Sequence, residues 1–145
     1  PFHPQVFANY IARANEIIFM PEPPLKINES PGWWLCRFCD YKDICHGEML
    51  PEINCRTCCH STPVADGKWS CAQHPDIMLE TTEQQLAGCV DHVIHPKLMP
   101  YEMVEMSAEF NHILYKTENG EQFKQGPGYI TSKDLKEHGT KILPG

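Results

Sequence analysis

Cysteine placement constrains this chain more than any other feature. Two dense runs, CRFCDYKDICHG and NCRTCCH, start at Cys36 and Asn54, and two further cysteines follow at positions 71 and 89. The chain has 145 residues, of which 41% are hydrophobic and 13 are proline, so it can bury only a modest core and form few long elements. We therefore expect the cysteines to help hold its middle together.

Cysteines can do this as disulfides in an oxidising compartment or as metal ligands in a reducing one. Close CxxC pairs interleaved with histidines favour a metal. The sequence shows no signal peptide and no apolar run long enough to span a bilayer. We therefore predict metal binding, a cytoplasmic location and no membrane partner.

The more complete ligand set, called here the second cysteine set, joins a CxxC pair to two later thiols. Two thiolates on a tight knuckle and two from elsewhere suit a tetrahedral zinc ion, whose binding contributes directly to folding. The members are Cys55, Cys58, Cys71 and Cys89.

Three histidines compete for the fourth position of this second set, namely His60, His74 and His92. We favour the all-cysteine set, in which each histidine bonds a thiolate or a backbone carbonyl beside the metal or lies at the surface. Cys59 directly follows Cys58 and would point away from the ion, so we predict a small buried apolar residue there.

The first cysteine set has three thiols, Cys36, Cys39 and Cys45, and needs a fourth ligand. His46 is the nearest candidate in sequence, Cys59 or His60 would have to fold back, and a ligand from outside this chain is the remaining alternative. The expected cofactor is zinc.

Local signals predict an α+β fold with a helix over 4–20, a proline-rich strap over 21–31 and a zinc-ribbon-like middle. A hairpin is expected around Asp66–Lys68, and a short helix capped by Thr81 or Thr82 should end at Gly88. A second hairpin should turn at Asn119-Gly120, and a last helix should follow Thr131 or Ser132 and stop at Gly139. We predict three segments: the helix and the proline-rich strap over 1–31, the cysteine-rich metal-binding module over 32–96, and the second hairpin with the last helix over 97–145.

Charge and side-chain chemistry exclude several classes of function. The formal net charge is −7, so the chain lacks the broad basic surface of a nucleic-acid-binding protein, and any DNA contact must be local. No expected helix offers a basic face to a DNA groove. The histidines near the cysteines are better explained as ligands or their neighbours than as partners of a nucleophile, so we assign no catalytic residue.

The triplet Cys36-Arg-Phe-Cys39 followed by Cys45 resembles the C-terminal cysteine triplet of RecB-like PD-(D/E)xK nucleases that carry an iron-sulfur cluster. Such proteins include AddB-type helicase-nuclease subunits and CRISPR-adaptation nucleases. Together with NCRTCCHSTP, GCVDH, HPKLMP and the tail from YKTENGEQFKQGPG to TSKDL, it resembles the C-terminal region of phage and prophage nucleases of this superfamily. The resemblance covers nearly the whole chain.

This resemblance implies a parent Mg-dependent DNA exonuclease whose catalytic core lies before Pro1 or is lost. It also makes a 4Fe-4S cluster on Cys36, Cys39 and Cys45 the alternative to zinc. In the nuclease core, two carboxylates hold the metal and a lysine orients water. Asp66-Gly-Lys68 and Asp134-Leu-Lys136 match the three-letter pattern, but they fall in a predicted turn and a predicted helix, with no carboxylate strand before them. We therefore expect no catalysis by this chain alone.

Two functions follow as hypotheses. The first is a metal-binding module that buttresses the nuclease core and shapes the path of the DNA, in the cytoplasm of a bacterial host of the phage or prophage. The alternative is a free-standing phage zinc protein that binds a host or phage protein, for which the acidic charge and the apolar N-terminal helix are suited.

Overall fold

The computed structural model describes residues 2–20, 25–47 and 49–138. Its first element, α1 (Pro4–Phe19), starts after His3 with Pro4 in the first turn and ends where Met20 takes an extended conformation. The predicted N-terminal helix is therefore confirmed. Of the predicted strap, residues 21–24 lie outside the described residues, and 25–31 form neither helix nor strand.

The cysteine-rich part is built from short elements. The first cysteine set lies on a 3-10 turn η1 (Cys36–Phe38) and a one-turn helix α2 (Lys42–Cys45). The second begins on another 3-10 turn, η2 (Cys55–Thr57). Turns this short bury few side chains, so they need support from elsewhere in the structure.

A small antiparallel sheet follows, with strand order β1-β2-β3. Strands β1 (Ser61–Pro63) and β2 (Trp69–Cys71) are joined through η3 (Ala65–Gly67), where Asp66 and Gly67 have φ of 59° and 69°. Asp and Gly tolerate this left-handed backbone. The predicted first hairpin is confirmed, and β3 (Met78–Leu79) is an additional strand.

Helix α3 (Thr82–Ala87) is attached to this sheet by a buried glutamine. Its cap is confirmed, because the Thr81 hydroxyl accepts from the Gln84 backbone N–H while the Gln84 side chain accepts from Thr81. The Gln85 side chain donates to the carbonyls of Gly67 and Leu79, at 2.9 and 3.1 Å. It also accepts from the Arg56 guanidinium at 2.7 Å, which joins α3 to η2.

A second antiparallel sheet, order β4-β5-β6, forms most of the last third. It contains β4 (Glu102–Met106), β5 (Ile113–Lys116) and β6 (Gln122–Gln125), and it follows a 3-10 turn, η4 (Pro96–Leu98). The β5–β6 hairpin with Asn119-Gly120 at its turn is confirmed. The predicted last helix is α4 (Ser132–His138), and its predicted stop at Gly139 lies outside the described residues.

The main hydrophobic core lies where the cysteine-rich segment meets this second sheet and α4. It consists of Val93, Ile94, Met99, Ile113, Tyr115, Phe123 and Leu135. A single bridge between Cys58 and Ile94 connects this core to the knuckle of the second cysteine set. Helices and antiparallel sheets are thus mixed, which confirms the α+β class.

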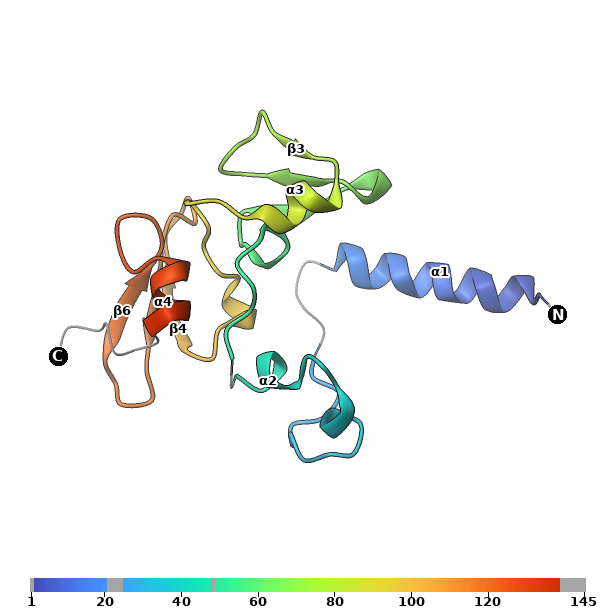
Figure 1. Ribbon diagram of the computed structural model, residues 1–145, viewed down its shortest axis with the longest axis horizontal. Coiled ribbons are helices and arrows are strands. Elements are labelled where there is room, and N and C mark those ends of the chain that lie inside the picture. The colour runs from blue at the N-terminus through green and yellow to red at the C-terminus, as the bar shows by residue number, and fades with distance from the viewer. Residues whose placement is uncertain (1, 21–24, 48, 139–145) are drawn as a thin grey trace.

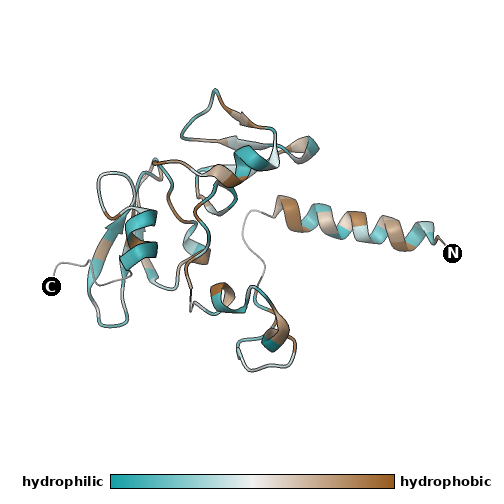
Figure 2. Cartoon of the chain, in the orientation of Figure 1, coloured by the Kyte–Doolittle hydropathy of each residue, from teal (hydrophilic) through white to brown (hydrophobic). Residues whose placement is uncertain are grey.

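Helix α1 projects away from the rest of the fold, and the hydrophobicity colouring shows apolar residues along it (Figures 1 and 2). None of its residues is buried. Its apolar side chains form a stripe along the helix, which no other described part of the chain buries. No helix in the described ranges has the length and apolar character needed to cross a membrane.

Candidate metal centres

The CxxC pair of the second cysteine set lies on a capped knuckle. The Asn54 side chain accepts from the Arg56 backbone N–H at 3.0 Å, and the Cys58 N–H bonds the Cys55 carbonyl at 3.3 Å. This turn holds both thiols near each other. Burial raises the pKa of the Cys55 thiol, and the neighbouring thiols of Cys58 and Cys71 raise it further.

The sheet and α3 bring the two remaining thiols of this set to the knuckle. Cys71 ends β2 opposite Ser61, and Cys89 follows Gly88 at the end of α3. Burial raises the pKa of Cys89, and so does its proximity to Cys58 and Cys55. The structure therefore brings the four predicted cysteines to one region, although no three of their sulfur atoms lie within 4.8 Å of one another.

Backbone groups hydrogen-bond three of these thiols. Gly88 bonds Cys55, His60 and Val93 bond Cys58, and Asp91 bonds Cys89, each lowering the pKa of the thiol it contacts. Backbone donors stabilise a thiolate over a thiol, which is the form a metal requires. The largest effect on the Cys58 thiol is a hydrogen bond with the Cys59 side chain. The pKa of the Cys58 thiol is lowered to about 7.

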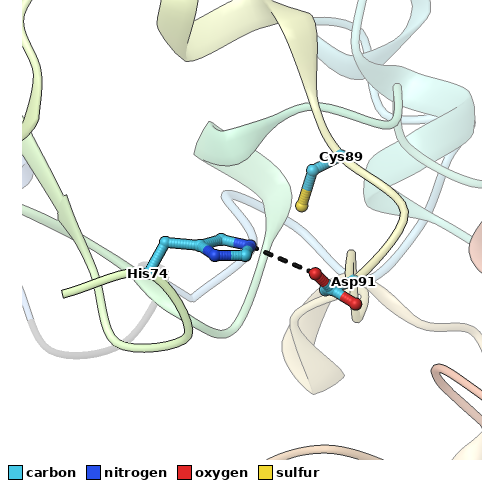
Figure 3. Close-up of side chains that lie close together, drawn as sticks. All are labelled: His74, Cys89 and Asp91. Carbon is cyan, nitrogen blue, oxygen red and sulfur yellow. Dashed lines mark ion pairs between the residues drawn. The ribbon is translucent and has the colours of Figure 1, made fainter. Parts of the chain in front are cut away.

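A tighter group of donors includes one residue that sequence reasoning missed. His74, Cys89 and Asp91 place one ligand atom each within 4.8 Å of one another, which no other set does among the described residues (Figure 3). The His74 Nε2 atom lies 3.1 Å from a carboxylate oxygen of Asp91. Asp91 stands two residues after Cys89 in GCVDH, and this spacing was the available signal.

His60 and His92, two of the predicted rival ligands, have different surroundings. His60 is 3% exposed, its Nε2 atom has no hydrogen-bond partner, and burial lowers its pKa. Both ring nitrogens of His92 instead contact protein groups, Nδ1 at 2.8 Å from the Ser132 hydroxyl and Nε2 at 3.1 Å from the Asn54 carbonyl. His92 thus has a structural environment, whereas His60 keeps one nitrogen unpartnered.

The first cysteine set lines a cavity of about 60 Å³. All three thiols and His46 contribute to its wall, along with Ile27, Leu35 and Lys42. The His46 Nε2 atom is buried and has no hydrogen-bond partner. Three thiols and one unpartnered imidazole nitrogen are suitable donors for a tetrahedral metal ion, although no three of these ligand atoms lie within 4.8 Å of one another. Of the fourth ligands considered, the structure places His46 at this cavity.

Cys59 and His60 lie with the second cysteine set instead. Cys59 packs against the hydrophobic core, with its Sγ atom 3.9 Å from the Phe110 carbonyl. Its hydrogen bond with the Cys58 side chain raises the pKa of its thiol, and burial raises it further. Cys59 is thus a partly buried packing residue whose thiol also contacts that of Cys58. All eight cysteines are free thiols, so each remains available for a metal or for packing.

The two Asp-x-Lys patterns serve structural roles. Lys68 pairs with Glu80 at 3.1 Å across the first sheet, beside the turn that contains Asp66. Asp134 accepts from the Thr131 hydroxyl at 2.6 Å and helps cap α4. Asp66 lies in the turn η3 and Asp134 in the helix α4, so neither aspartate lies on a strand.

Comparison of the chain with protein-family models, curated proteins and solved structures finds no match.

Proposed function

We propose that this chain is a zinc-stabilised accessory module of a phage-type PD-(D/E)xK DNA nuclease. It binds zinc at both cysteine sets, and the second set, with its knuckle and short sheet, forms a zinc-ribbon-like unit. The module supports the nuclease core and shapes the DNA path without cutting DNA itself. It works in the cytoplasm of the bacterial host, where thiols stay reduced.

The observation that carries the metal assignment is the convergence of thiols with unpartnered or backbone-bonded donors. Thiols in the second set accept backbone hydrogen bonds, and the first set contains the buried, unpartnered Nε2 of His46. If only apolar side chains filled the cavity, the His46 nitrogen would stay unpaired, and an unpaired buried nitrogen costs about 1–3 kcal/mol. A bound ion removes this cost and satisfies the thiolates.

Support for a partner comes from apolar surface in the N-terminal third. On α1 the side chains of Val6, Phe7, Tyr10, Ile11, Ile17 and Ile18 are each about half exposed or more. Around the first cysteine set, Trp34, Phe38 and Tyr41 are 62%, 82% and 71% exposed. Large contiguous apolar surface marks an interaction site. The sequence resemblance indicates that the partner covering this apolar surface is the nuclease core.

Metal analysis tests the first part of this proposal. Protein purified without oxygen should contain zinc, and Cys36→Ser/Cys39→Ser and Cys55→Ser/Cys58→Ser variants should each lose about one ion per chain. A brown sample absorbing near about 400 nm would place a 4Fe-4S cluster at Cys36, Cys39 and Cys45 instead. A colourless sample without zinc contradicts the metal assignment.

A nuclease assay tests the second part. The pure chain should not cleave linear DNA in Mg²⁺, and the product of the full reading frame should do so only when its own core carboxylates are intact. Cleavage by the isolated chain would overturn the accessory role.

The alternative is a free-standing phage zinc protein that binds a host or phage protein through the same apolar surface. The exposed face of α1 favours it as much as it favours a nuclease core. Sequencing upstream of the Pro1 codon separates the two. An open frame encoding a carboxylate-rich core supports the nuclease module, and a start codon directly before Pro1 supports the free-standing protein.

A further inference from the structure

More metal donors gather around the second cysteine set than one zinc ion can use. The same part of the fold holds the four thiols, the imidazoles of His60 and His74 and the Asp91 carboxylate, and three of these donors, His74, Cys89 and Asp91, lie within 4.8 Å of one another. A structural zinc ion takes four ligands in a tetrahedron. Two such ions that share one ligand take seven, which is the number of donors gathered here.

We propose that this region holds two metal ions bridged by the Cys89 thiolate. One ion takes Cys55, Cys58 and Cys71, and the other takes His74, Asp91 and the free nitrogen of His60. The inference deepens the proposed function, because it rests on zinc binding by the second cysteine set.

Three of the four ligand atoms proposed for the second ion already lie close together. Ligand atoms around a tetrahedral zinc ion are about 3.3–3.8 Å apart, given bond lengths near 2.0–2.3 Å. The chosen atoms of His74, Cys89 and Asp91 already lie within 4.8 Å of one another. They come from the β2–β3 loop and the segment after α3 (Figure 3). Small side-chain rotations therefore suffice to close the site.

His60 supplies the fourth donor. Its side chain is almost fully buried, and its Nε2 atom has no hydrogen-bond partner. Its carbonyl accepts from the Ala72 N–H at 2.8 Å, two residues before His74. An orphaned buried nitrogen is costly unless something binds it. A metal ion beside the His74–Asp91 pair provides that partner.

Charge balance supports a second cation. Four thiolates and the Asp91 carboxylate carry more negative charge than one Zn²⁺ neutralises, so these groups repel one another. The basic side chains nearest in sequence are engaged elsewhere. Arg56 donates to Gln85 at 2.7 Å, and Lys68 pairs with Glu80 at 3.1 Å. A second Zn²⁺ turns this repulsion into attraction.

The two ions differ in accessibility. The side chains of His74 and Asp91 are 39% and 29% exposed, so the added ion lies at the rim, whereas the Cys58 side of the cluster is buried. Mixed nitrogen, oxygen and sulfur donors suit Zn²⁺ and Co²⁺. We expect the rim ion to exchange with solution faster than the ion on the thiolates.

Native mass spectrometry of the zinc-loaded chain tests this proposal. Wild type should carry about three zinc ions, one at the first cysteine set and two here, and a His74→Gln/Asp91→Asn variant should carry about two. The matched control is His138→Gln/Asp76→Asn, which removes the same chemical groups from exposed positions and should keep the wild-type number. Circular dichroism should show the same fold in all three.

A wild type that carries only two zinc ions, or a His74→Gln/Asp91→Asn variant that keeps three, overturns the inference. Failure of the proposed function has a different signature, because zinc content would then not respond to Cys55→Ser/Cys58→Ser. Cobalt adds an independent readout. Two bridged Co²⁺ ions couple magnetically, so the electron paramagnetic resonance signal from this region should fall as the rim site fills. A signal that only rises contradicts the bridge.

Discussion

The Nδ1 atom of His92 lies 2.8 Å from the hydroxyl oxygen of Ser132, 40 residues further along the chain. The same hydroxyl accepts from the Gln125 side chain at 2.8 Å, and the other ring nitrogen of His92 faces the Asn54 carbonyl at 3.1 Å. This buried network joins the knuckle of the second cysteine set to β6 and α4. We therefore expect metal binding at the knuckle to be coupled to folding of the C-terminal part.

Acid should weaken this connection. Burial lowers the pKa of His92 from 6.5 to about 4, so the unfolded chain binds a proton that the folded chain does not. The resulting stability is complete above pH 6.5 and is lost as the pH falls through 4. The loss between pH 7 and pH 5 should be about 2 kcal/mol in urea unfolding at saturating zinc.

A His92→Gln variant is the control for this measurement, because it keeps the acid sensitivity of the thiolates and removes that of the imidazole. Its unfolding free energy should fall less between pH 7 and pH 5 than that of wild type. A nuclear magnetic resonance titration that places the His92 midpoint near 6.5 would contradict the prediction.

Gly88 is required for the close approach of α3 to the knuckle. Its φ is 69°, and an added Cβ atom would lie 2.7 Å from the Ile53 carbonyl oxygen. We expect Gly88→Ala to cost about 2–4 kcal/mol of stability, because strain and a backbone clash combine. It should also weaken zinc binding, since the Gly88 backbone bonds the Cys55 thiol.

Gly67→Ala is a matched control, with the same φ of 69° and no heavy atom within 4 Å of the added Cβ. It should cost only the conformational part, about 1–2 kcal/mol. Denaturant unfolding and a zinc-competition assay give both quantities. Equal losses in the two variants would show that the contact with Ile53 is unimportant.

Local signals predicted much of the fold. The caps at Thr81 and Thr131, the Asn119-Gly120 turn and the stripe of α1 all act within a few residues, so the sequence alone carries them. Strand β4 lacks such a signal. Its sequence EMVEM does not alternate, and all five residues are exposed. Its place is decided by pairing with β5, which depends on the tertiary structure.

The candidate sites likewise contain some residues that local sequence patterns predict and others that only the tertiary structure brings together. The thiols were predictable because CxxC spacing is local, and His46 follows Cys45 directly. Asp91 was not, because it meets His74 only when the β2–β3 loop folds over the segment after α3. Histidine roles were likewise open, since the partners of His92 come from residues far apart in sequence.

Removing the Tyr115 hydroxyl should not destabilise the protein. Tyr115 is fully buried, and its hydroxyl has no hydrogen-bond partner among the described residues. An unsatisfied buried hydroxyl costs free energy, so Tyr115→Phe should be neutral or stabilising by up to about 1 kcal/mol. Leu135→Ala, at an equally buried position, should lose about 2–5 kcal/mol. Thermal unfolding of both variants checks this, and a loss above about 1 kcal/mol in Tyr115→Phe contradicts it.

Metal removal should unfold the two halves of the chain to different extents. The first sheet has strands of two or three residues, and among them Leu79 alone is a buried apolar residue, so it depends on the ions. The second sheet has its own core, with Tyr115 packed against Phe123 at 5.7 Å between ring centroids. A chelator should therefore abolish amide protection over 55–91 and leave protection in β5 and β6.

Hydrogen exchange read by mass spectrometry measures this, and adding back zinc should restore the protection. The Cys59 N–H, which bonds the Val93 carbonyl at 2.9 Å, lies at the boundary between the halves and should lose protection only partly. Simultaneous loss of protection in both sheets would show that the His92–Ser132 network makes them one cooperative unit. Unchanged protection over 55–91 would show instead that the first sheet does not need the metal.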